Sequence, residues 1–464
     1  MVLEAGKGTS IEDRGSRLDT RGSFVAAGGR AMITTFKKGG IHPPKGKNLT
    51  RDKAVRTLPP PPQVVLPLSQ HLGVPCESKV AKGDVVKVGQ VIGESPAFVS
   101  ASIHASIAGK VTNVGPMPNP VLGQAPAVTI ESDETDTWVE LGPERDWKKL
   151  SSEEILGSIR SSGLVGLGGA AFPTHVKLSP PKDKPIKVCI LNGAECEPYL
   201  TADYRLMVEE TDKIITGLAI MMKVLGAEEG YIGVEDDKPE AITLLKKAVA
   251  KMNIEVVTLE AKYPQGAEKQ LIAAIVGREV PSGGLPMDVG CVVQNVGTAA
   301  AITQAVTTRR PLIDRIVTVT GPGIASPQNI RVRSGSSFSF VIDQCGGLKG
   351  EPGKVIMGGP MMGIAQASLD VPVIKGTSGI LVFPRAEIPP DQPGPCISCG
   401  RCLRACPMSL MPSIIGILAE NERFEEAKRY NLLDCVECGC CAYVCPARRP
   451  MVHLFKYAKA ALRK

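Results

Sequence analysis

The sequence predicts a multidomain protein in which two β-rich modules flank an α/β domain and a cysteine-rich helical domain ends the chain. Three observations support this prediction. Residues 62–131 alternate short β-like runs with Gly and Pro turns, residues 144–310 alternate helix and strand patterns, and the pattern C-x2-C-x2-C-x3-C-P occurs twice after residue 395. At 464 residues the chain is long enough for several hydrophobic cores.

The basic charge is concentrated at the start of the chain. Residues 1–60 hold 12 Lys/Arg and 5 Asp/Glu, a balance of +7 that equals the formal net charge of the whole chain. Charge runs in polar leaders are usually solvated, although a basic head can also touch anionic lipid or an acidic partner. We therefore expect residues 1–32 to be a flexible extension. Aromatic residues make up only 4%, which disfavours nucleic-acid binding.

Residues 33–143 are predicted to form a barrel-sandwich module. The expected strands are Val64–Leu68, Asp84–Ile92, Lys110–Val114 and Ala127–Glu131. The runs 82–90 and 108–111 resemble the fold of biotinyl and lipoyl carriers, in which a lysine at a hairpin tip receives the cofactor. The matching stretch here, Glu94–Phe98, has no lysine. We therefore expect a docking or structural module rather than a swinging arm.

Residues 144–310 are predicted to form an α/β domain with a largely parallel sheet, because helix and strand patterns alternate. Ser151 and Glu154 form a possible capping box for its first helix. The expected strands are Ile186–Leu191, Gly230–Val234 and Ile254–Leu259, and the expected helices after the first are Arg205–Leu225, Pro239–Met252 and Ala267–Val276.

Residues 311–375 are β-rich again and are predicted to form a small β-grasp-like domain. Its expected strands are Arg315–Thr320, Asn329–Val332, Phe338–Ile342 and Lys354–Met357. Residues 376–464 are predicted to form the cysteine-rich domain, with a helix at Glu420–Tyr430 between the two cysteine motifs.

The doubled cysteine motif predicts two [4Fe–4S] clusters in a ferredoxin-like domain. The two copies are Cys396, Cys399, Cys402 and Cys406 before Pro407, and Cys435, Cys438, Cys441 and Cys445 before Pro446. In two-cluster ferredoxins the fourth cysteine of each run ligates the other cluster, so Cys445 is expected to complete the first cluster and Cys406 the second. Two zinc knuckles are the alternative, but zinc gives no reason for the whole pattern to recur.

The other cysteines favour a reducing compartment. Of 14 in total, five are scattered outside the motifs, and scattered unpaired cysteines with cluster-type runs are typical of proteins without disulfides. Cys440 lies inside the second copy and offers a shifted ligand frame. Because that frame breaks the x2 spacing, we expect Cys440 to be a bystander. No apolar stretch approaches the ~20 residues needed to span a bilayer, and no secretory signal is visible.

A glycine-rich loop is the second strong signal. Gly166, Gly168 and Gly169 allow the backbone to approach a ligand and present N–H groups to a phosphate. The loop is not the dinucleotide fingerprint, because a helix precedes it and the spacing differs. Polar loops at 192–198, 263–268 and 294–298 are further candidates, since ligands bind beyond the carboxyl ends of parallel strands. Taken singly, each is more simply a solvated loop.

These segments carry a family resemblance. GLGGAAFPTHVK (166–177) and residues 192–198 are similar to the flavin- and NADH-binding segments of the NADH-oxidising subunit of respiratory complex I. The chain from about Gly39 to Arg449 resembles more closely the RnfC family, the C subunits of Rnf membrane electron-transport complexes. The supporting strings are ECEPYLTADYRLM (195–207), YPQGAEKQLI (263–272), VPSGGLPMDVG (280–290) and VIMGGPMMGIAQ (355–366).

The resemblance implies a non-covalent FMN beside an NAD(H) site. The residues that it implies for the FMN phosphate and ring are Gly166, Gly168, Gly169, Lys177, Asn192, Asn295 and Thr298. Those implied for the nicotinamide or the flavin edge are Phe172, Glu195, Glu197 and Glu268. The complex I protein differs at Leu167, Ala194 and Ala267, where it has an arginine, an acidic residue and a glutamate. Phosphate contact here is therefore expected to depend more on Lys177 and the backbone.

The function implied is that of an electron-transfer subunit in an Rnf-type complex, exchanging electrons between NAD(H) and ferredoxin through FMN and two [4Fe–4S] clusters. No side chain is expected to act as a nucleophile or general base. Ion translocation would belong to membrane subunits, ferredoxin would be reached through another subunit, and the chain would lie on the cytoplasmic face of the membrane. The alternatives are a soluble reductase such as a cobalamin reductase, and a carrier scaffold that has lost flavin binding.

Overall fold

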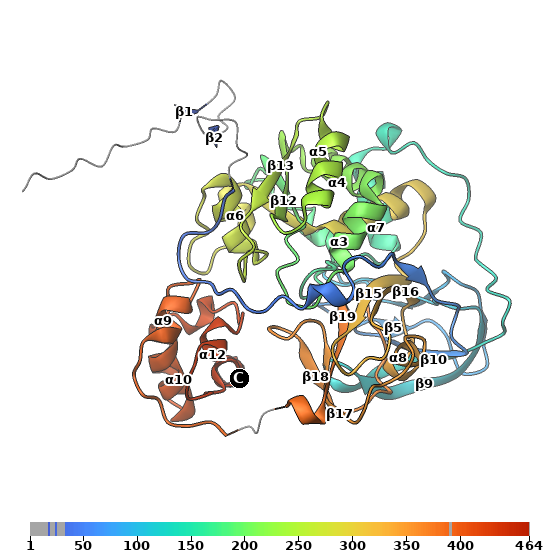
Figure 1. The fold of residues 1–464 in the computed structure, drawn as a ribbon. Helices are drawn as coiled ribbons and strands as arrows, with labels where there is room; N and C mark the ends of the chain where they lie inside the picture. Colours follow the sequence, from blue (N-terminus) through green and yellow to red (C-terminus); the bar gives the residue numbers. More distant parts are fainter. Residues whose placement is uncertain (1–16, 19–23, 26–32, 389–391, 464) are drawn as a thin grey trace, which may run out of the picture.

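The computed structural model describes residues 17–18, 24–25, 33–388 and 392–463. The predicted extension, residues 1–32, falls outside them except for the paired strands β1 (Arg17–Leu18) and β2 (Phe24–Val25). Among the described residues, no helix is long and apolar enough to cross a membrane. Figure 1 shows the α/β domain above the β-grasp-like domain, with the cysteine-rich helices forming a separate group beside both.

The barrel-sandwich module consists of two small sheets that enclose one apolar core. Their orders are β4-β10-β9-β6 and β5-β7-β8. The strands are β4 (Gln63–Pro67), β5 (Glu77–Ser78), β6 (Val85–Val86), β7 (Val91–Glu94), β8 (Ile103–His104), β9 (Gly109–Asn119) and β10 (Gly123–Ser132). The single strand predicted at Asp84–Ile92 is wrong. It is divided between β6 and β7, in different sheets, by a turn at Gly89 whose φ of 83° favours glycine.

The α/β domain contains the predicted parallel sheet, in the order β13-β12-β11-β14. Its strands are β11 (Val188–Asn192), β12 (Glu229–Glu235), β13 (Ile254–Leu259) and β14 (Cys291–Asn295). Val188 and Ile190 join one buried cluster, whereas Cys189 and Leu191 join another. Both faces of the sheet are therefore covered, which explains why β11 is apolar from Val188 to Leu191.

Seven helices accompany this sheet in the described residues. They are α1 (Ser152–Ser161), α2 (Thr174–Lys177), α3 (Ala202–Glu209), α4 (Thr211–Leu225), α5 (Pro239–Val249), α6 (Glu268–Val276) and α7 (Val296–Thr308). The capping box at Ser151 and Glu154 is confirmed. The single helix predicted at Arg205–Leu225 is wrong, because the backbone breaks at Glu210. The segment 294–298, expected as a loop, is the end of β14 and the start of α7.

The β-grasp-like domain has a mixed sheet in the order β18-β17-β19-β15-β16-β3. The strands are β15 (Asp314–Thr320), β16 (Gln328–Arg333), β17 (Pro352–Met357), β18 (Ile364–Gln366) and β19 (Gly379–Pro384). β19 lies in the middle of this sheet, beyond the expected boundary at 375. The strand predicted at Phe338–Ile342 is wrong. It is helix α8 (Phe338–Asp343), because Ser337 caps its N-terminus and its buried side chains follow a helical spacing.

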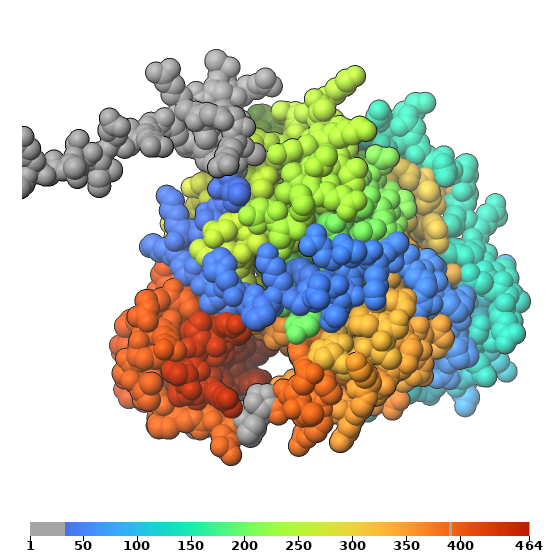
Figure 2. All heavy atoms as spheres, in the orientation of Figure 1, coloured from blue at the N-terminus to red at the C-terminus, as the bar shows by residue number. Residues whose placement is uncertain are grey.

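A segment that we call the strap, residues 33–58, joins three domains. Ile41 pairs with Tyr263 in the α/β domain, and the amide of Gly40 donates to the carbonyl of Ala405 in the cysteine-rich domain at 3.0 Å. At its far end β3 (Arg56–Thr57) adds an edge strand to the β-grasp-like sheet. Figure 2 shows the strap in blue across the face where these domains meet.

The cysteine-rich domain is helical, as predicted. Its helices are α9 (Arg401–Ala405), α10 (Pro412–Glu420), α11 (Phe424–Arg429), α12 (Cys440–Tyr443) and α13 (Met451–Ala461). The helix predicted at Glu420–Tyr430 begins later, at Phe424, because α10 ends at Glu420. Short 3-10 helices in the described residues are η1 (Lys47–Leu49), η2 (Trp147–Lys149), η3 (Pro286–Val289), η4 (Arg385–Glu387) and η5 (Leu432–Asp434).

Helices α4 and α7 approach each other closely at Gly217. A Cβ at Gly217 would lie 2.0 Å from the carbonyl oxygen of Ala299 in α7, whereas a Cβ at Gly157 in α1 would meet no atom within 4 Å. We expect Gly157→Ala to stabilise the protein by up to about 1 kcal/mol through helix propensity. Gly217→Ala should destabilise it by roughly 1–3 kcal/mol through overpacking. Chemical denaturation checks both, and equal effects would contradict the close approach.

Candidate functional site

Two asparagines mark the carboxyl edge of the parallel sheet. Asn192 ends β11 and Asn295 ends β14, and the two are paired in register. The side-chain amide of Asn192 donates to the carbonyl of Gly266 at 2.8 Å. The Asn295 side chain accepts from the amide of Gly297 at 2.7 Å and caps α7. The structure thus brings together three of the predicted polar segments where ligands bind in open sheets.

The glycine loop is anchored above this edge. The amide of Gly166 donates to the carbonyl of Phe172 at 2.9 Å, which closes the loop. The amide of Leu167 donates to Oγ1 of Thr298, also at 2.9 Å, and the buried guanidinium of Arg315 donates to the carbonyl of Leu167 at 3.1 Å. Thr298 is fully buried, so it holds the loop rather than exposing its hydroxyl to a ligand. Sequence reasoning did not identify Arg315.

Gly168 and Gly169 form the exposed crest of the loop. A Cβ at Gly168 would lie 2.6 Å from the side-chain nitrogen of Asn295, so the loop rests directly on that side chain. A Cβ at Gly169 would meet no atom within 4 Å. The crest therefore leaves open space beside exposed backbone, which is the arrangement that a phosphate-bearing cofactor requires.

Lys177 and Glu268 lie at the same edge and form an ion pair at 2.5 Å between α2 and α6. Their side chains are 28% and 36% exposed, so a charged ligand can reach either of them. His175, which precedes them in the same helix as Lys177, points elsewhere. Its Nε2 donates to the carbonyl of Phe98 at 2.8 Å in the barrel-sandwich module, and burial lowers its pKa. His175 is thus a packing residue.

Glu195 and Glu197 are held by neighbouring backbone. Glu195 has a left-handed φ of 48°, and its carboxylate accepts from the amide of Asp203 at 2.7 Å. Glu197 accepts from the amides of Met361 and Met362 at 3.1 and 2.8 Å. Burial raises the pKa of both glutamates to about 7. Neither carboxylate is a freely exposed group at the glycine loop.

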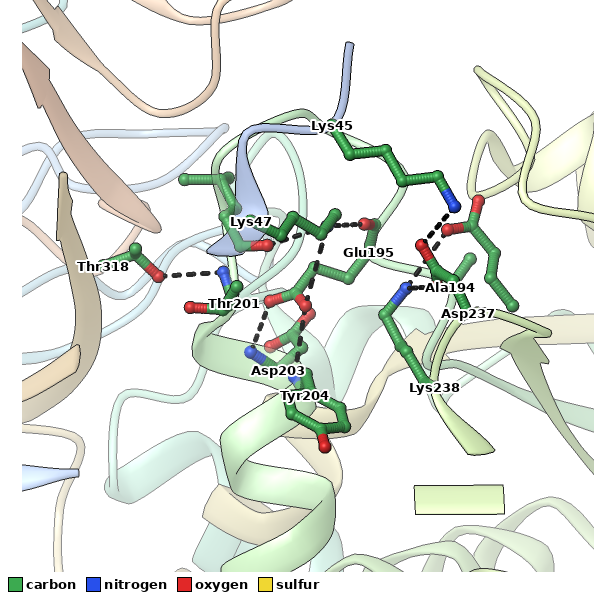
Figure 3. A network of polar contacts seen from close by, with 12 residues as sticks. Lys45, Lys47, Ala194, Glu195, Thr201, Asp203, Tyr204, Asp237, Lys238 and Thr318 are labelled. Atoms are coloured by element: carbon green, nitrogen blue, oxygen red, sulfur yellow. Dashed lines mark hydrogen bonds and ion pairs between the residues drawn. The ribbon is translucent and has the colours of Figure 1, made fainter. Parts of the chain in front are cut away.

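A lysine from the strap reaches the same loop. Lys47 donates from Nζ to the carbonyls of Glu195 and Leu200 at 2.6 and 2.7 Å, and lies 3.9 Å from the Glu195 carboxylate. Figure 3 shows Lys47 and Glu195 beside Asp203, whose carboxylate accepts from Asn295 at 2.6 Å. A chain of contacts therefore connects the strap to the residue beneath the glycine loop.

Further buried charges surround this contact. Lys238 donates to Asp237 at 2.9 Å and to Glu235 at 3.1 Å, and its side chain is only 3% exposed. Lys45 of the strap reaches Asp237 at 2.8 Å (Figure 3). Sequence reasoning did not identify these residues, because the strap lies far from them along the chain. The one available signal was the pair of lysines in PPKGK of the strap.

The four cysteines expected for the first cluster line one hollow in the structure. Cys396, Cys399 and Cys402 of the first motif face Cys445 of the second across it, together with Arg401 and Met451. The chain crossing that brings Cys445 to the first motif is the one expected from ferredoxins.

The other four cysteines gather at the side of the domain that faces the α/β domain. Burial raises the pKa of Cys441, and the thiols of Cys435, Cys438 and Cys406 raise it further, so these three lie within electrostatic reach of Cys441. Backbone amides donate at 3.4 Å to the sulfurs of Cys406 and Cys435. Such N–H···S bonds adjust cluster potentials.

Cys440 lies beside these four cysteines, and its thiol donates a hydrogen bond to the sulfur of Cys438, which lowers the pKa of Cys438. It is fully buried, and its sulfur contacts the carbonyl of Tyr263 at 4.0 Å on the α/β side. The hydroxyl of Tyr263 in turn donates to the carbonyl of Cys438 at 2.8 Å. Cys440 thus lies next to the four cysteines, and its expected role as a bystander stays a prediction. The Tyr263 contact shows that one cysteine group sits directly against the α/β domain.

Comparison with known proteins identifies the family. The chain matches models described as the RnfC barrel sandwich hybrid domain (34–135), the Nuo51 FMN-binding domain (159–304), the SLBB domain (316–365) and the 4Fe-4S dicluster domain (395–448). It is 53% identical to the C subunit of the proton-translocating ferredoxin:NAD(+) oxidoreductase complex of Clostridium ljungdahlii, over 93% of this chain and 95% of that one. The chain belongs to the RnfC family.

Other members of the RnfC family are also similar to this chain in sequence, over similar lengths. The C subunit of the Na(+)-translocating ferredoxin:NAD(+) oxidoreductase complex of Acetobacterium woodii is 48% identical over 92% of this chain and 96% of that one. The C subunit of the ion-translocating oxidoreductase complex of Rhodobacter capsulatus is 40% identical over 92% and 83%. The 4Fe-4S match excludes the zinc-knuckle alternative, and the FMN-binding match fits the open glycine crest. This RnfC chain is thus an oxidoreductase subunit with FMN and two [4Fe–4S] clusters.

The two crest glycines provide the first prediction for this site. Gly168→Ala should displace Asn295 and destabilise the protein by roughly 1–3 kcal/mol, because the Asn295 side chain is fixed by two hydrogen bonds. Gly169→Ala should leave stability within about 0.5 kcal/mol of the parent and yet weaken FMN binding, since its Cβ enters the open space. Thermal unfolding of the flavin-free protein and FMN titration separate the two effects. If Gly169→Ala binds FMN with the affinity of the parent, the open space beside the crest is not part of the FMN site.

The buried carboxylates predict opposite pH dependences. The pKa of Glu195 is raised by burial from 4.5 to about 7, so ionisation of Glu195 destabilises the folded state as pH rises from about 4.5 to 7. Glu195→Gln removes that contribution, and its stability relative to the parent should increase across this window. Denaturation at pH 4.5, 6 and 8 (roughly spanning the two pKa values) measures it, and a flat difference would contradict the assignment.

Asp237 provides the control, because its effect on stability changes with pH in the opposite direction to that of Glu195. Although burial opposes it, the charge of Lys238 and the hydrogen bond from Lys45 hold the pKa of Asp237 below its usual 3.8. The ionised carboxylate therefore stabilises the fold above pH 3.8, and this contribution is lost as pH falls below that value. Asp237→Asn should accordingly be less stable than the parent at both pH 6 and pH 8 (each roughly two units or more above the usual pKa).

Proposed function

We propose that this chain is the NAD(H)-reactive subunit of an Rnf-type complex that exchanges electrons between NAD(H) and ferredoxin. The observation that supports this most directly is the physical joining of the FMN-binding domain to one cysteine group, through the Tyr263–Cys438 hydrogen bond. The relatives named as C subunits of ferredoxin:NAD(+) oxidoreductase complexes, which align along nearly their whole length, supply the reaction. FMN, when bound, supplies the conversion between two-electron hydride chemistry and one-electron transfer.

The carboxyl edge provides the residues for that cofactor. The backbone of Gly166, Gly168 and Gly169 would receive the phosphate, with Lys177 as the nearby cation. Asn192 and Asn295 would support the ring side, and Thr298 would act indirectly by fixing the loop.

The nicotinamide side is proposed for the residues that border the same edge. Phe172 and Glu268 lie beside the glycine loop and Lys177, and are proposed to face the nicotinamide or the flavin edge. Glu195 and Glu197 would position the 193–197 loop rather than contact the ligand through free carboxylates, since backbone amides already occupy both. No side chain in this arrangement needs to act as a nucleophile or general base.

For the metal centres, the proposed ligands of the first cluster are Cys396, Cys399, Cys402 and Cys445, and those of the second are Cys406, Cys435, Cys438 and Cys441. The second group contacts the α/β domain through Tyr263 and the strap. The first group opens to solvent, with Cys399 exposed. The second cluster is therefore proposed to be the one adjacent to the flavin and the first to be the exit toward partners.

The remaining partners follow from the relatives. Membrane subunits of the complex would carry ion translocation, and ferredoxin would be reached through another subunit. This assignment would place the chain at the cytoplasmic face of the membrane as a peripheral subunit. A soluble cobalamin reductase is the alternative, and the match to the RnfC barrel sandwich model over residues 34–135 favours the Rnf assignment.

The proposed reaction is tested by adding NADH to the anaerobically purified protein. We expect the flavin absorbance to bleach first and the absorbance of the clusters to fall afterwards, because reducing equivalents enter at the flavin. Stopped-flow spectra resolve the order. Iron present without flavin, together with no response to NADH, would instead indicate a carrier scaffold.

The order of the clusters is tested by a matched pair of variants. Cys406→Ser removes a proposed ligand of the second cluster and should slow reduction of both clusters by NADH by at least roughly tenfold, although the flavin still bleaches. Cys445→Ser alters only the first cluster and should leave rapid reduction of the second intact. Freeze-quenched electron paramagnetic resonance distinguishes the two clusters. The opposite pattern would reverse the proposed order.

A further inference from the structure

The hollow lined by Cys396, Cys399, Cys402 and Cys445, here called the first cysteine pocket, opens to solvent at its mouth. Cys399 is exposed, and Ile397 beside it is 65% exposed. The second group, in contrast, is covered by Tyr263 and by the strap, where Gly40 bonds to Ala405. The first pocket is thus the place at which another protein can approach a cluster closely without displacing part of this chain.

The mouth is also positively charged. Arg401 lines the pocket, and the guanidinium of Arg404 lies over Gly400, 3.7 Å from where a Cβ at Gly400 would be. Both arginines are exposed, and within residues 33–388 and 392–463 neither forms an ion pair with a carboxylate. The described residues that line the pocket include no Asp or Glu. Among the described residues, the two cations at the mouth therefore have no carboxylate partner.

Apolar residues accompany the two cations. Ile397 lines the pocket and is 65% exposed, and Leu403, which precedes Arg404 in α9, is 37% exposed outside the pocket lining. Protein interfaces are enriched in arginine beside apolar contacts, and charged groups at their edges steer association. Electron-transfer encounters are small and salt-sensitive, which suits a surface of this size.

We propose that this mouth, formed by Ile397, Cys399, Arg401 and Arg404, is the docking surface for an acidic iron–sulfur protein or domain. The inference rests on the proposed function, because it assumes that a cluster occupies the pocket. The two arginines complement carboxylates on the partner and repel a basic one. An anionic membrane also carries negative charge, but electrostatic binding to lipid needs a larger cluster of basic residues than these two arginines, which favours a compact patch on a protein.

The test measures binding separately from electron transfer. The probe is a purified, oxidised, acidic ferredoxin with two [4Fe–4S] clusters, which stands in for the acidic iron–sulfur domain of a partner subunit. It is added to the intact oxidised holoprotein at low and moderate salt. We expect measurable binding that weakens as salt rises. The double charge reversal Arg401→Glu/Arg404→Glu should raise the Kd by at least roughly tenfold.

Lys246 and Lys247 provide the matched control. Both are exposed basic residues in α5 of the α/β domain. Lys246→Glu/Lys247→Glu makes the same change in net charge and should leave the ferredoxin Kd within about twofold of the parent. If the reversed arginine variant loses its cluster absorbance, Arg401→Gln/Arg404→Gln replaces it, with a smaller expected increase in Kd.

The possible outcomes separate the two proposals. Unchanged ferredoxin binding in the arginine variants, or an equal loss in the lysine control, overturns the docking surface. Arginine-dependent binding to anionic vesicles without ferredoxin binding overturns it in favour of a lipid contact. Failure of NADH to bleach the flavin of the parent protein contradicts the proposed function instead, and it is recorded in an experiment that needs no ferredoxin.

Discussion

The buried ammonium of Lys47 is the contact on which the arrangement of the candidate site depends. Its side chain is 11% exposed, and burial lowers its pKa. The cost of removing this charge from water is offset by two carbonyls and by the nearby Glu195 carboxylate. Breaking such a pair by removing one member is far more damaging than never having it, because an uncompensated charge is left behind. The strap is therefore fixed where it crosses the loop after β11.

Fixing the strap there also determines where the cysteine-rich domain sits. Ile41, a few residues before Lys47, pairs with Tyr263, and Gly40 bonds to Ala405. A Cβ at Gly39 would lie 2.4 Å from the carbonyl oxygen of Cys406, so this close passage needs glycine. The same segment thus touches the loop that borders the flavin site and the backbone of a cluster cysteine. The strap therefore contacts both the flavin-site side and the cluster side of the molecule.

The parts of this site that sequence reasoning could predict are those with local causes. Cluster ligation imposes a fixed spacing on Cys396–Cys406 and Cys435–Cys445, and backbone approach to a ligand favours the glycines at 166, 168 and 169. The capping box at Ser151 is equally local. Phe338–Ile342 was misassigned because its buried positions suit a strand or a helix, and only the cap at Ser337 decides between them. Lys47 could not be predicted, since its partners lie about 150 residues away and no local pattern marks them.

The barrel-sandwich module shows how a carrier-like fold can serve a fixed role. Its segment 94–98, at the position where carriers place their lysine, lies against the α/β domain. The carbonyl of Phe98 accepts from His175, the two rings meet edge to face at 5.4 Å, and Arg160 reaches the carbonyl of Pro96. Lys375 adds a second tie, since its buried ammonium donates to Ser102 and to Gly163 at the start of the glycine loop. These contacts fix the tip against the α/β domain and agree with the structural role expected for a module whose tip has no lysine. Through Lys375 they also reach the start of the glycine loop.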